Sequence, residues 1–162
     1  NNLTEPQYAA IGRVAVESGT LEREVGEYFG YLHKNMPAKA GTLGPKLEAL
    51  QALLASPSVP HSGATDFDSA ISALLLLVSR CNAVVHGVWS SGSNAPVQLG
   101  DVTVKGRKAS LHAKEIAALA SKLRIGRKLL LRLFHDHFPL GTVPKKCPKR
   151  SAAELLPRLL AP

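Results

Sequence analysis

The sequence contains little cysteine, few aromatic residues and no long hydrophobic run. Its two cysteines are too few for a disulfide framework and suit the reducing cytoplasm. The longest apolar run, AISALLLLV from Ala70, is too short to span a bilayer, and no charged segment leads into an apolar one at the start of the chain. We therefore expect a cytoplasmic protein without membrane contacts.

Aromatic residues make up only 5% of the 162 residues, so the core must be built mainly from Leu, Ala and Val. Such a core suits packed helices better than a sandwich of short strands, which relies on aromatic and β-branched side chains. The balance of 45% hydrophobic and 20% charged residues is that of one ordinary globular domain. We predict an all-α, antiparallel helical bundle over residues 1–138, followed by a basic, proline-containing tail over residues 139–162.

Acidic residues are scarce in the last third of the chain. Up to Val104 there are six Lys and Arg against nine Asp and Glu, a net charge of −3, whereas from Lys105 onward there are fourteen against three, a net charge of +11. A basic surface of this kind raises the local concentration of polyanions. RNA or another nucleic acid is therefore the first partner that the sequence indicates.

Apolar residues recur at helical spacing in four segments: Glu5 to about His33, about Pro45 to Ala55, Asp66 to Gly87 and about Leu111 to Phe138. Thr65 or Asp66 is expected to cap the third of these helices. Between Val88 and Lys105, glycine, asparagine and proline interrupt valine-rich stretches, which predicts a small β-hairpin or an extended loop. Prolines in the tail allow only a short amphipathic turn, at Ala152 to Leu156.

The first predicted helix carries four acidic residues, Glu17, Glu22, Glu24 and Glu27. We expect them to face solvent or to pair with basic residues of a neighbouring subunit. The second arrangement would explain the uneven charge without nucleic acid, because the acidic helix of one copy would contact the basic last helix of another.

The stretch SRCNAVVHGVW, residues 79–89, places polar residues near the end of an otherwise apolar helix. Asn82 and His86 lie about 40° from each other around such a helix, whereas Arg80 lies about 120° from His86. An imidazole can move a proton to or from a ribose 2′-hydroxyl, and a guanidinium can stabilise charge on a phosphate, so this set suits phosphodiester cleavage without a metal. The alternative is structural, with His86 favoured by the helix dipole and Asn82 bonded to local backbone.

The same stretch resembles the motif of the HEPN superfamily of small helical-bundle proteins at Arg80, Asn82, His86 and Gly87. AIGRVAVESGTLEREV resembles the opening helix of these proteins, and the likeness extends in outline over residues 5–137. HEPN proteins typically use an arginine and a histidine as a metal-independent endoribonuclease centre, often shared across a homodimer, in bacterial toxin–antitoxin or antiphage defence systems. In the commonest motif the arginine directly precedes the asparagine, whereas here Cys81 separates the two.

By this resemblance, Arg80 would neutralise the phosphate, Asn82 would orient it or the imidazole, and His86 would transfer the proton, leaving 2′,3′-cyclic phosphate ends. The expected protein is a homodimer packed along its first and third helices, with an antitoxin or another defence-system protein as a further partner. Many HEPN-like proteins have lost activity, so the alternative function is a non-catalytic module that binds a partner protein or a nucleic-acid backbone.

Five basic residues of the last long helix are predicted to hold the RNA backbone: Lys122, Arg124, Arg127, Lys128 and Arg132. The alternative is an ordinary solvated basic face. Aromatic residues are not interleaved with these side chains, so any contact should be directed at the backbone rather than at the bases. We expect no metal or other cofactor, because His135 and His137 point apart on a helix and form no zinc site with Cys147.

Overall fold

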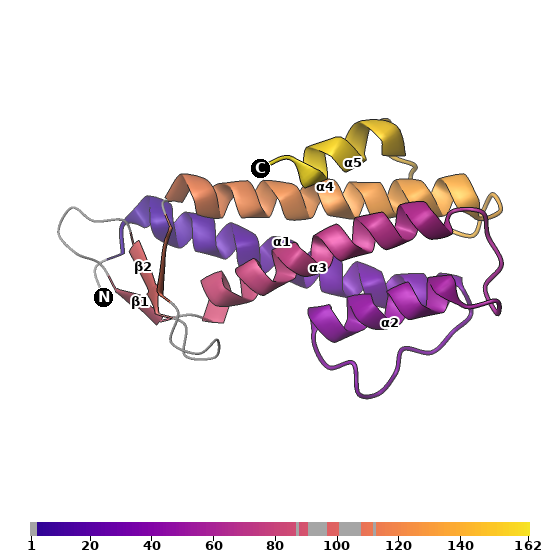
Figure 1. Ribbon diagram of the computed structural model, residues 1–162, viewed down its shortest axis with the longest axis horizontal. Helices are drawn as coiled ribbons and strands as arrows, with labels where there is room; N and C mark the ends of the chain where they lie inside the picture. Colours follow the sequence, from indigo (N-terminus) through magenta and orange to yellow (C-terminus); the bar gives the residue numbers. More distant parts are fainter. Residues whose placement is uncertain (1–2, 87, 91–96, 101–107, 112) are drawn as a thin grey trace.

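The chain folds into a bundle of helices, described in a computed structural model over residues 3–86, 88–90, 97–100, 108–111 and 113–162. Figure 1 shows the five described helices: α1 (Glu5–Tyr31), α2 (Leu43–Ala55), α3 (Ala64–His86), α4 (Ala113–His137) and α5 (Ala152–Leu160). The prediction of an all-α helical bundle is confirmed.

The two longest helices, α1 and α4, lie side by side and run in the same direction, and α3 runs opposite to both (Figure 1). Glu17 of α1 binds Arg124 of α4, and further along both helices Tyr28 stacks on Phe134. The order of these contacts along both helices is that of a parallel pair. The predicted antiparallel arrangement therefore holds for α3 against α1 and α4 but is wrong for the pair α1 and α4. α2 packs on α1 and α3, and α5 lies along α4 on the side away from α2 (Figure 1). The bundle therefore has an α2 side and an α5 side.

The core is aliphatic along most of its length and aromatic at one end. Within the segments of helical apolar spacing, Val14 and Leu21 of α1 and Leu123 of α4 are fully buried. Tyr28 stacks on Phe134 with ring centroids 4.1 Å apart, and Phe67 of α3 meets Phe134 edge-on at 5.1 Å. The few aromatic residues are thus concentrated where α1, α3 and α4 meet, and they tie the three helices together.

The helix α3 begins earlier than predicted. Its first hydrogen bond runs from the Phe67 N–H to the Gly63 carbonyl (3.0 Å), so Thr65 and Asp66 lie inside the first turn and the prediction that one of them caps the helix is wrong. Asp66 instead interacts favourably with the positive end of the helix dipole. By length and a mean hydropathy of 1.5, α3 is also apolar enough to cross a membrane, a test that the buried core helix of a bundle passes equally well.

The region between α3 and α4 contains three short strands, β1 (Val88–Ser90), β2 (Val97–Gly100) and β3 (Lys108–Leu111). They form an antiparallel sheet in the order β1-β2-β3, with Trp89 opposite Leu99 and Leu99 opposite Ala109. The predicted hairpin corresponds to β1 and β2. Because β3 takes the chain as far as Leu111, α4 begins at Ala113.

The segment that follows Pro139 packs back onto the bundle as α5. The helix begins with a capping box, in which the Ser151 Oγ accepts from the Glu154 N–H (3.3 Å) and the Glu154 carboxylate accepts from the Ser151 N–H (2.8 Å). Leu155 and Leu159 are buried against α4. Their burial offsets the hydrogen bond that Pro157 cannot donate, so α5 is longer than the predicted turn.

The packing of α4 on α3 depends on the absence of a side chain at Gly126. A methyl group there would overlap the fully buried side chain of Leu74. We expect Gly126→Ala to lower the free energy of unfolding by about 1–2 kcal/mol. The matched change Gly26→Ala, at an exposed α1 position with no neighbouring atom, should raise it by about 0.5–1 kcal/mol. Urea titration measures both, and equal effects would contradict this packing.

Candidate functional site

The three predicted catalytic residues lie on the exposed surface of the last turns of α3. Arg80, Asn82 and His86 are all exposed, whereas Cys81 is 2% exposed and faces the core. Among the described residues, none of the three side chains has a hydrogen-bond or ion-pair partner. The structural role considered for Asn82, a hydrogen bond to local backbone, is therefore not formed within this part of the chain.

Asn82 and His86 line a hollow of about 450 Å³, here called the His86 hollow. Its walls come from three helices, with Ala15, Ser18, Gly19 and Glu22 on α1, Thr42 and Leu43 at the start of α2, and Asn82, Val85 and His86 on α3. Three of the four α1 residues are small, which leaves room for a ligand between α1 and the end of α3. The hollow thus places Asn82 and His86, two of the predicted catalytic residues, beside a surface of α1 and the N-terminus of α2. Neither of these two neighbours was predicted from the sequence.

The N-terminus of α2 supplies a positive wall of this hollow. The Thr42 side chain makes no capping hydrogen bond, so the N–H groups of Leu43 and Gly44 are not satisfied by a cap, and Pro45, the third residue of the helix, has no N–H. These groups and the helix dipole favour an anion at this position. Lys46 of the same helix is held by Glu22 of α1, with Nζ 2.6 Å from Oε1. The hollow therefore places this helix end beside one carboxylate, that of Glu22, whose charge Lys46 offsets.

Arg80 does not line the His86 hollow. It lies about 120° from His86 around α3, on the far side of an exposed strip that contains Leu76, whose side chain is 75% exposed. On the neighbouring α1, Val16 is 67% exposed. One chain thus brings Asn82 and His86 together and leaves Arg80 apart from them, so the predicted set is only partly assembled within a protomer.

Cys81 takes no part in this surface. Burial raises the pKa of the Cys81 thiol to about 11, so the thiol is neutral near pH 7 and is not a nucleophile. The cysteine that separates Arg80 from Asn82 in the sequence is therefore a core residue, whereas Arg80 next to it lies on the exposed surface.

Two of the five residues predicted to hold RNA, Arg124 and Arg127, form a partly buried network with acidic residues of α1. Arg127 donates from NH1 to the Glu17 Oε2 (2.5 Å) and from Nε to the Glu24 Oε2 (3.0 Å). Arg124 donates from Nε and NH2 to the Glu17 Oε1 (2.9 and 2.8 Å). Lys145 joins the same network through Glu24 and Glu27. These side chains hold α1, α4 and the following segment together.

The prediction that all four glutamates face solvent or a neighbouring subunit is wrong for Glu17 and Glu24, which are 6% and 8% exposed and paired within the chain. They are seven residues apart on the side of α1 that faces α4, so both fall in the helix interface. Burial alone would raise the pKa of Glu17, but hydrogen bonds from Arg124 and Arg127 lower it below its usual value of 4.5.

Two further predicted RNA-binding residues are also engaged. Arg132 donates to Asp136 (2.8 Å) and to the Pro148 carbonyl (3.3 Å), and Lys122 donates to the carbonyl of Ala161 at the end of α5. Of the five, Lys128 alone has no hydrogen bond or ion pair with the described residues. The α4 surface is therefore less available to RNA than its sequence indicates.

The histidines near the end of α4 have separate structural partners. His135 Nε2 lies 2.8 Å from the Lys145 carbonyl, and His137 Nδ1 lies 3.1 Å from Ser62 Oγ. In the described part of the chain, no three His, Cys, Asp or Glu side chains are placed to hold a metal ion.

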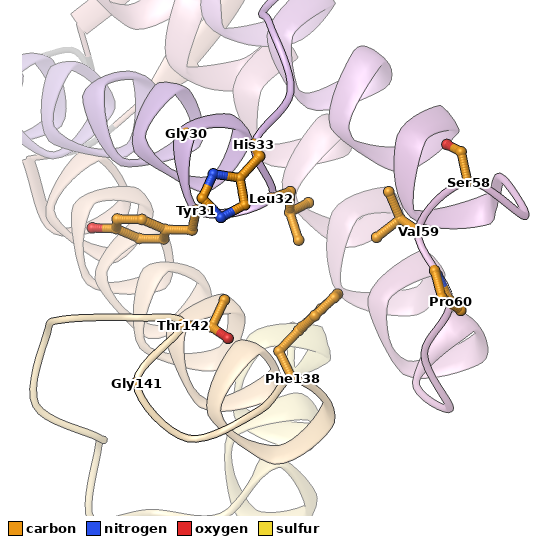
Figure 2. A pocket seen from close by; sticks show the side chains of 10 residues that line it. All are labelled: Gly30, Tyr31, Leu32, His33, Ser58, Val59, Pro60, Phe138, Gly141 and Thr142. Carbon is orange, nitrogen blue, oxygen red and sulfur yellow. The ribbon is translucent and has the colours of Figure 1, made fainter.

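A second hollow, of about 490 Å³, lies at the C-terminal end of α1 (Figure 2). It is lined by residues of the α1 end and of the segments after α2 and α4, among them Tyr31, His33, Val59, Pro60, Phe138 and Thr142. The Tyr31 hydroxyl is committed to Glu27 (3.2 Å). No lysine, arginine or carboxylate lines this hollow, so it offers neither an anion site nor an acid–base pair.

No protein-family model, curated protein or solved structure matches the chain. The likeness to HEPN proteins therefore stays a prediction. The function has to be argued from the residues and from the geometry around His86.

The ion pairs of Glu17 and Glu27 predict a dependence of stability on pH. Because the pKa values of Glu17 and Glu27 are lowered in the folded chain, their contribution to stability is fully present above the usual value of 4.5 and is lost as the pH falls through the lower, folded values. Glu17→Gln should lower the free energy of unfolding by about 2 kcal/mol near pH 7 and by much less near pH 3.

Chemical denaturation at the two pH values measures this difference. The matched control Glu48→Gln, at an exposed α2 position, should leave the stability unchanged at both. The same loss for Glu17→Gln at both pH values would show that its charge does not stabilise the fold.

Proposed function

We propose that the protein is a metal-independent endoribonuclease. The observation that carries this proposal is the hollow in which His86 and Asn82 lie beside the uncapped N-terminus of α2. An imidazole that transfers a proton and a helix end that stabilises a phosphate are the groups that such a reaction requires. The resemblance of RCNAVVHGVW to the HEPN motif supports the same assignment.

In the proposed reaction a ribose 2′-oxygen attacks the neighbouring phosphorus, and the bond from phosphorus to the 5′-oxygen breaks. His86 takes the proton of the 2′-hydroxyl or gives one to the leaving 5′-oxygen, and water handles the other proton. Asn82 orients the phosphate. The positive end of α2 and a guanidinium stabilise the charge that develops on it. The products are a 2′,3′-cyclic phosphate and a 5′-hydroxyl.

The guanidinium in this proposal is the partner subunit's Arg80. Arg80 is exposed outside the hollow of its own chain, so it is free to reach the hollow of a second copy. Exposed Leu76 on α3 and Val16 on α1 provide apolar surface against which that copy can pack. In a two-fold dimer along α1 and α3, each protomer would complete the site of the other.

The setting of this activity is proposed on the resemblance alone. A cytoplasmic RNA-cleaving toxin or antiphage protein would be held in check by an antitoxin or another defence-system partner. No cofactor takes part in the proposed reaction.

The alternative is a non-catalytic interaction module. The position of Arg80 outside the His86 hollow favours it, because a single chain then lacks one of its catalytic groups. In that case the exposed strip around Leu76 would bind a partner protein, and the His86 hollow would bind an anion without cleaving it.

An RNA cleavage assay in EDTA separates the two functions. His86→Ala and Arg80→Ala should each reduce cleavage by about 100-fold or more, and the wild-type cut ends should be cyclic phosphates. The matched control His33→Asn, in which asparagine tolerates the φ of 53°, should cleave like the wild type. No cleavage by a folded wild-type dimer would favour the interaction module.

Mixing the two inactive variants tests whether the site is shared. A dimer of one Arg80→Ala and one His86→Ala chain retains one site with the histidine of the first chain and the arginine of the second. Random mixing should therefore restore about a quarter of the wild-type activity, since about half of the dimers are mixed and each has one intact site. If each site uses one chain only, the mixture stays inactive.

A further inference from the structure

The docking of the C-terminal segment on α4 creates a groove that neither element forms alone. Two hollows, of about 240 Å³ and 430 Å³, adjoin there and share Lys128, Arg150 and Leu155 among the residues that line them. Leu155 is 1% exposed and lies between them, and Ile125 and Pro148 add further apolar contacts. We call this combined site the basic groove.

Six basic side chains and no acidic one line the basic groove: Arg124, Lys128, Lys146, Lys149, Arg150 and Arg158. Five of the six have no hydrogen bond or ion pair within the described part of the chain, and the sixth, Arg124, is still 62% exposed while it binds Glu17. The exposed Glu154 carboxylate accepts from the backbone N–H and the hydroxyl of Ser151 and offsets part of the charge of Arg150. Much of the uncompensated positive charge of the last third is therefore concentrated here.

The groove is held in place by the rest of the fold. Arg132 binds the Pro148 carbonyl (3.3 Å), His135 binds the Lys145 carbonyl (2.8 Å), and the Lys145 ammonium binds Glu24 and Glu27 of α1. The cations on the C-terminal segment are thus set opposite those on α4 before any ligand arrives. A site prepared in this way loses little conformational freedom on binding.

Cations on both walls above an apolar floor match a ligand with closely and regularly spaced negative charges. A phosphodiester backbone has this chemistry, and each phosphate that is neutralised releases bound counterions. No aromatic side chain lines the groove, so no base-stacking platform is present there. An acidic peptide would need apolar pockets for its side chains and partners for its own backbone, and the groove offers mainly charge.

The basic groove and the His86 hollow lie on different sides of α1. Arg124 reaches α1 at Glu17, which lies about 160° around the helix from Ala15 and Gly19 of the hollow. Figure 1 shows the same separation, with α5 and α2 on opposite sides of the bundle. A ligand of the groove therefore does not depend on the groups around His86.

We propose that the basic groove between α4 and the C-terminal segment is a binding site for the phosphodiester backbone of nucleic acid. It goes beyond the proposed cleavage, because it holds whether or not His86 is catalytic. It also differs from the site predicted on α4 alone, since four of its six cations belong to the C-terminal segment.

Fluorescence anisotropy with labelled 30-nucleotide RNA and DNA strands tests this site. The His86→Ala chain serves as the parent, so that binding is measured without cleavage. The triple variant Lys128→Ala, Lys149→Ala, Arg150→Ala should weaken binding of both strands by about tenfold or more and reduce the slope of log Kd against log salt by about 2. A matched control, Lys34→Ala, Lys39→Ala, Lys114→Ala, removes the same charge from exposed positions outside the groove and should bind like the parent.

Three results would overturn the proposal: no binding of either strand by the parent at low salt, the same loss in the control as in the groove variant, or unchanged binding by a folded groove variant. Binding of the same variants to vesicles of phosphatidylcholine and phosphatidylglycerol is measured as well. If the groove substitutions release the protein from these vesicles while leaving RNA binding intact, the groove is a lipid-headgroup site instead. If wild-type chains bind RNA but do not cleave it, the result counts against the proposed function and leaves the proposal for the basic groove intact.

Discussion

Glu17 and Glu24 carry two negative charges into the interface between the two longest helices, where Arg127 binds both. Removing a charge from water is costly unless its partner is held in good geometry, so a shift of α1 along α4 by one turn would leave these groups unpaired. We infer that the network fixes the register of the two helices. Because Lys145 extends it to the chain beyond α4, the same ion pairs also direct the C-terminal segment to its place on the bundle.

This arrangement divides the surface of the protein into two working sides. The α2 side has the His86 hollow, where the N-terminus of α2, the Asn82 amide and the His86 imidazole come together. The α5 side has the basic groove, which presents charge along the backbone of a longer strand. Since α1 lies between the two, a strand held in the groove would not reach the hollow of the same chain directly, which fits a dimer in which sites from two chains cooperate.

The helices were predictable because their apolar positions repeat with the period of a helix, and Val14, Leu21 and Leu123 are buried as that pattern indicates. The environments of the charged residues were not predictable in this way. A glutamate such as Glu17 has the same local spacing whether it faces water or a helix that starts about a hundred residues later, and only the packing of α4 decides between them. The placement of Arg80 outside the His86 hollow likewise depends on which face of α3 is buried, and the packing of the whole core decides that face.

Sedimentation equilibrium of the wild type and of Leu76→Arg, combined with the cleavage assay on the same samples, tests the central claim that the active site is shared between two chains. The account predicts a wild-type dimer that cleaves RNA and a folded Leu76→Arg monomer that does not, because a charge on this exposed strip opposes close packing of two α3 helices. A wild-type chain that cleaves RNA as a monomer would contradict it.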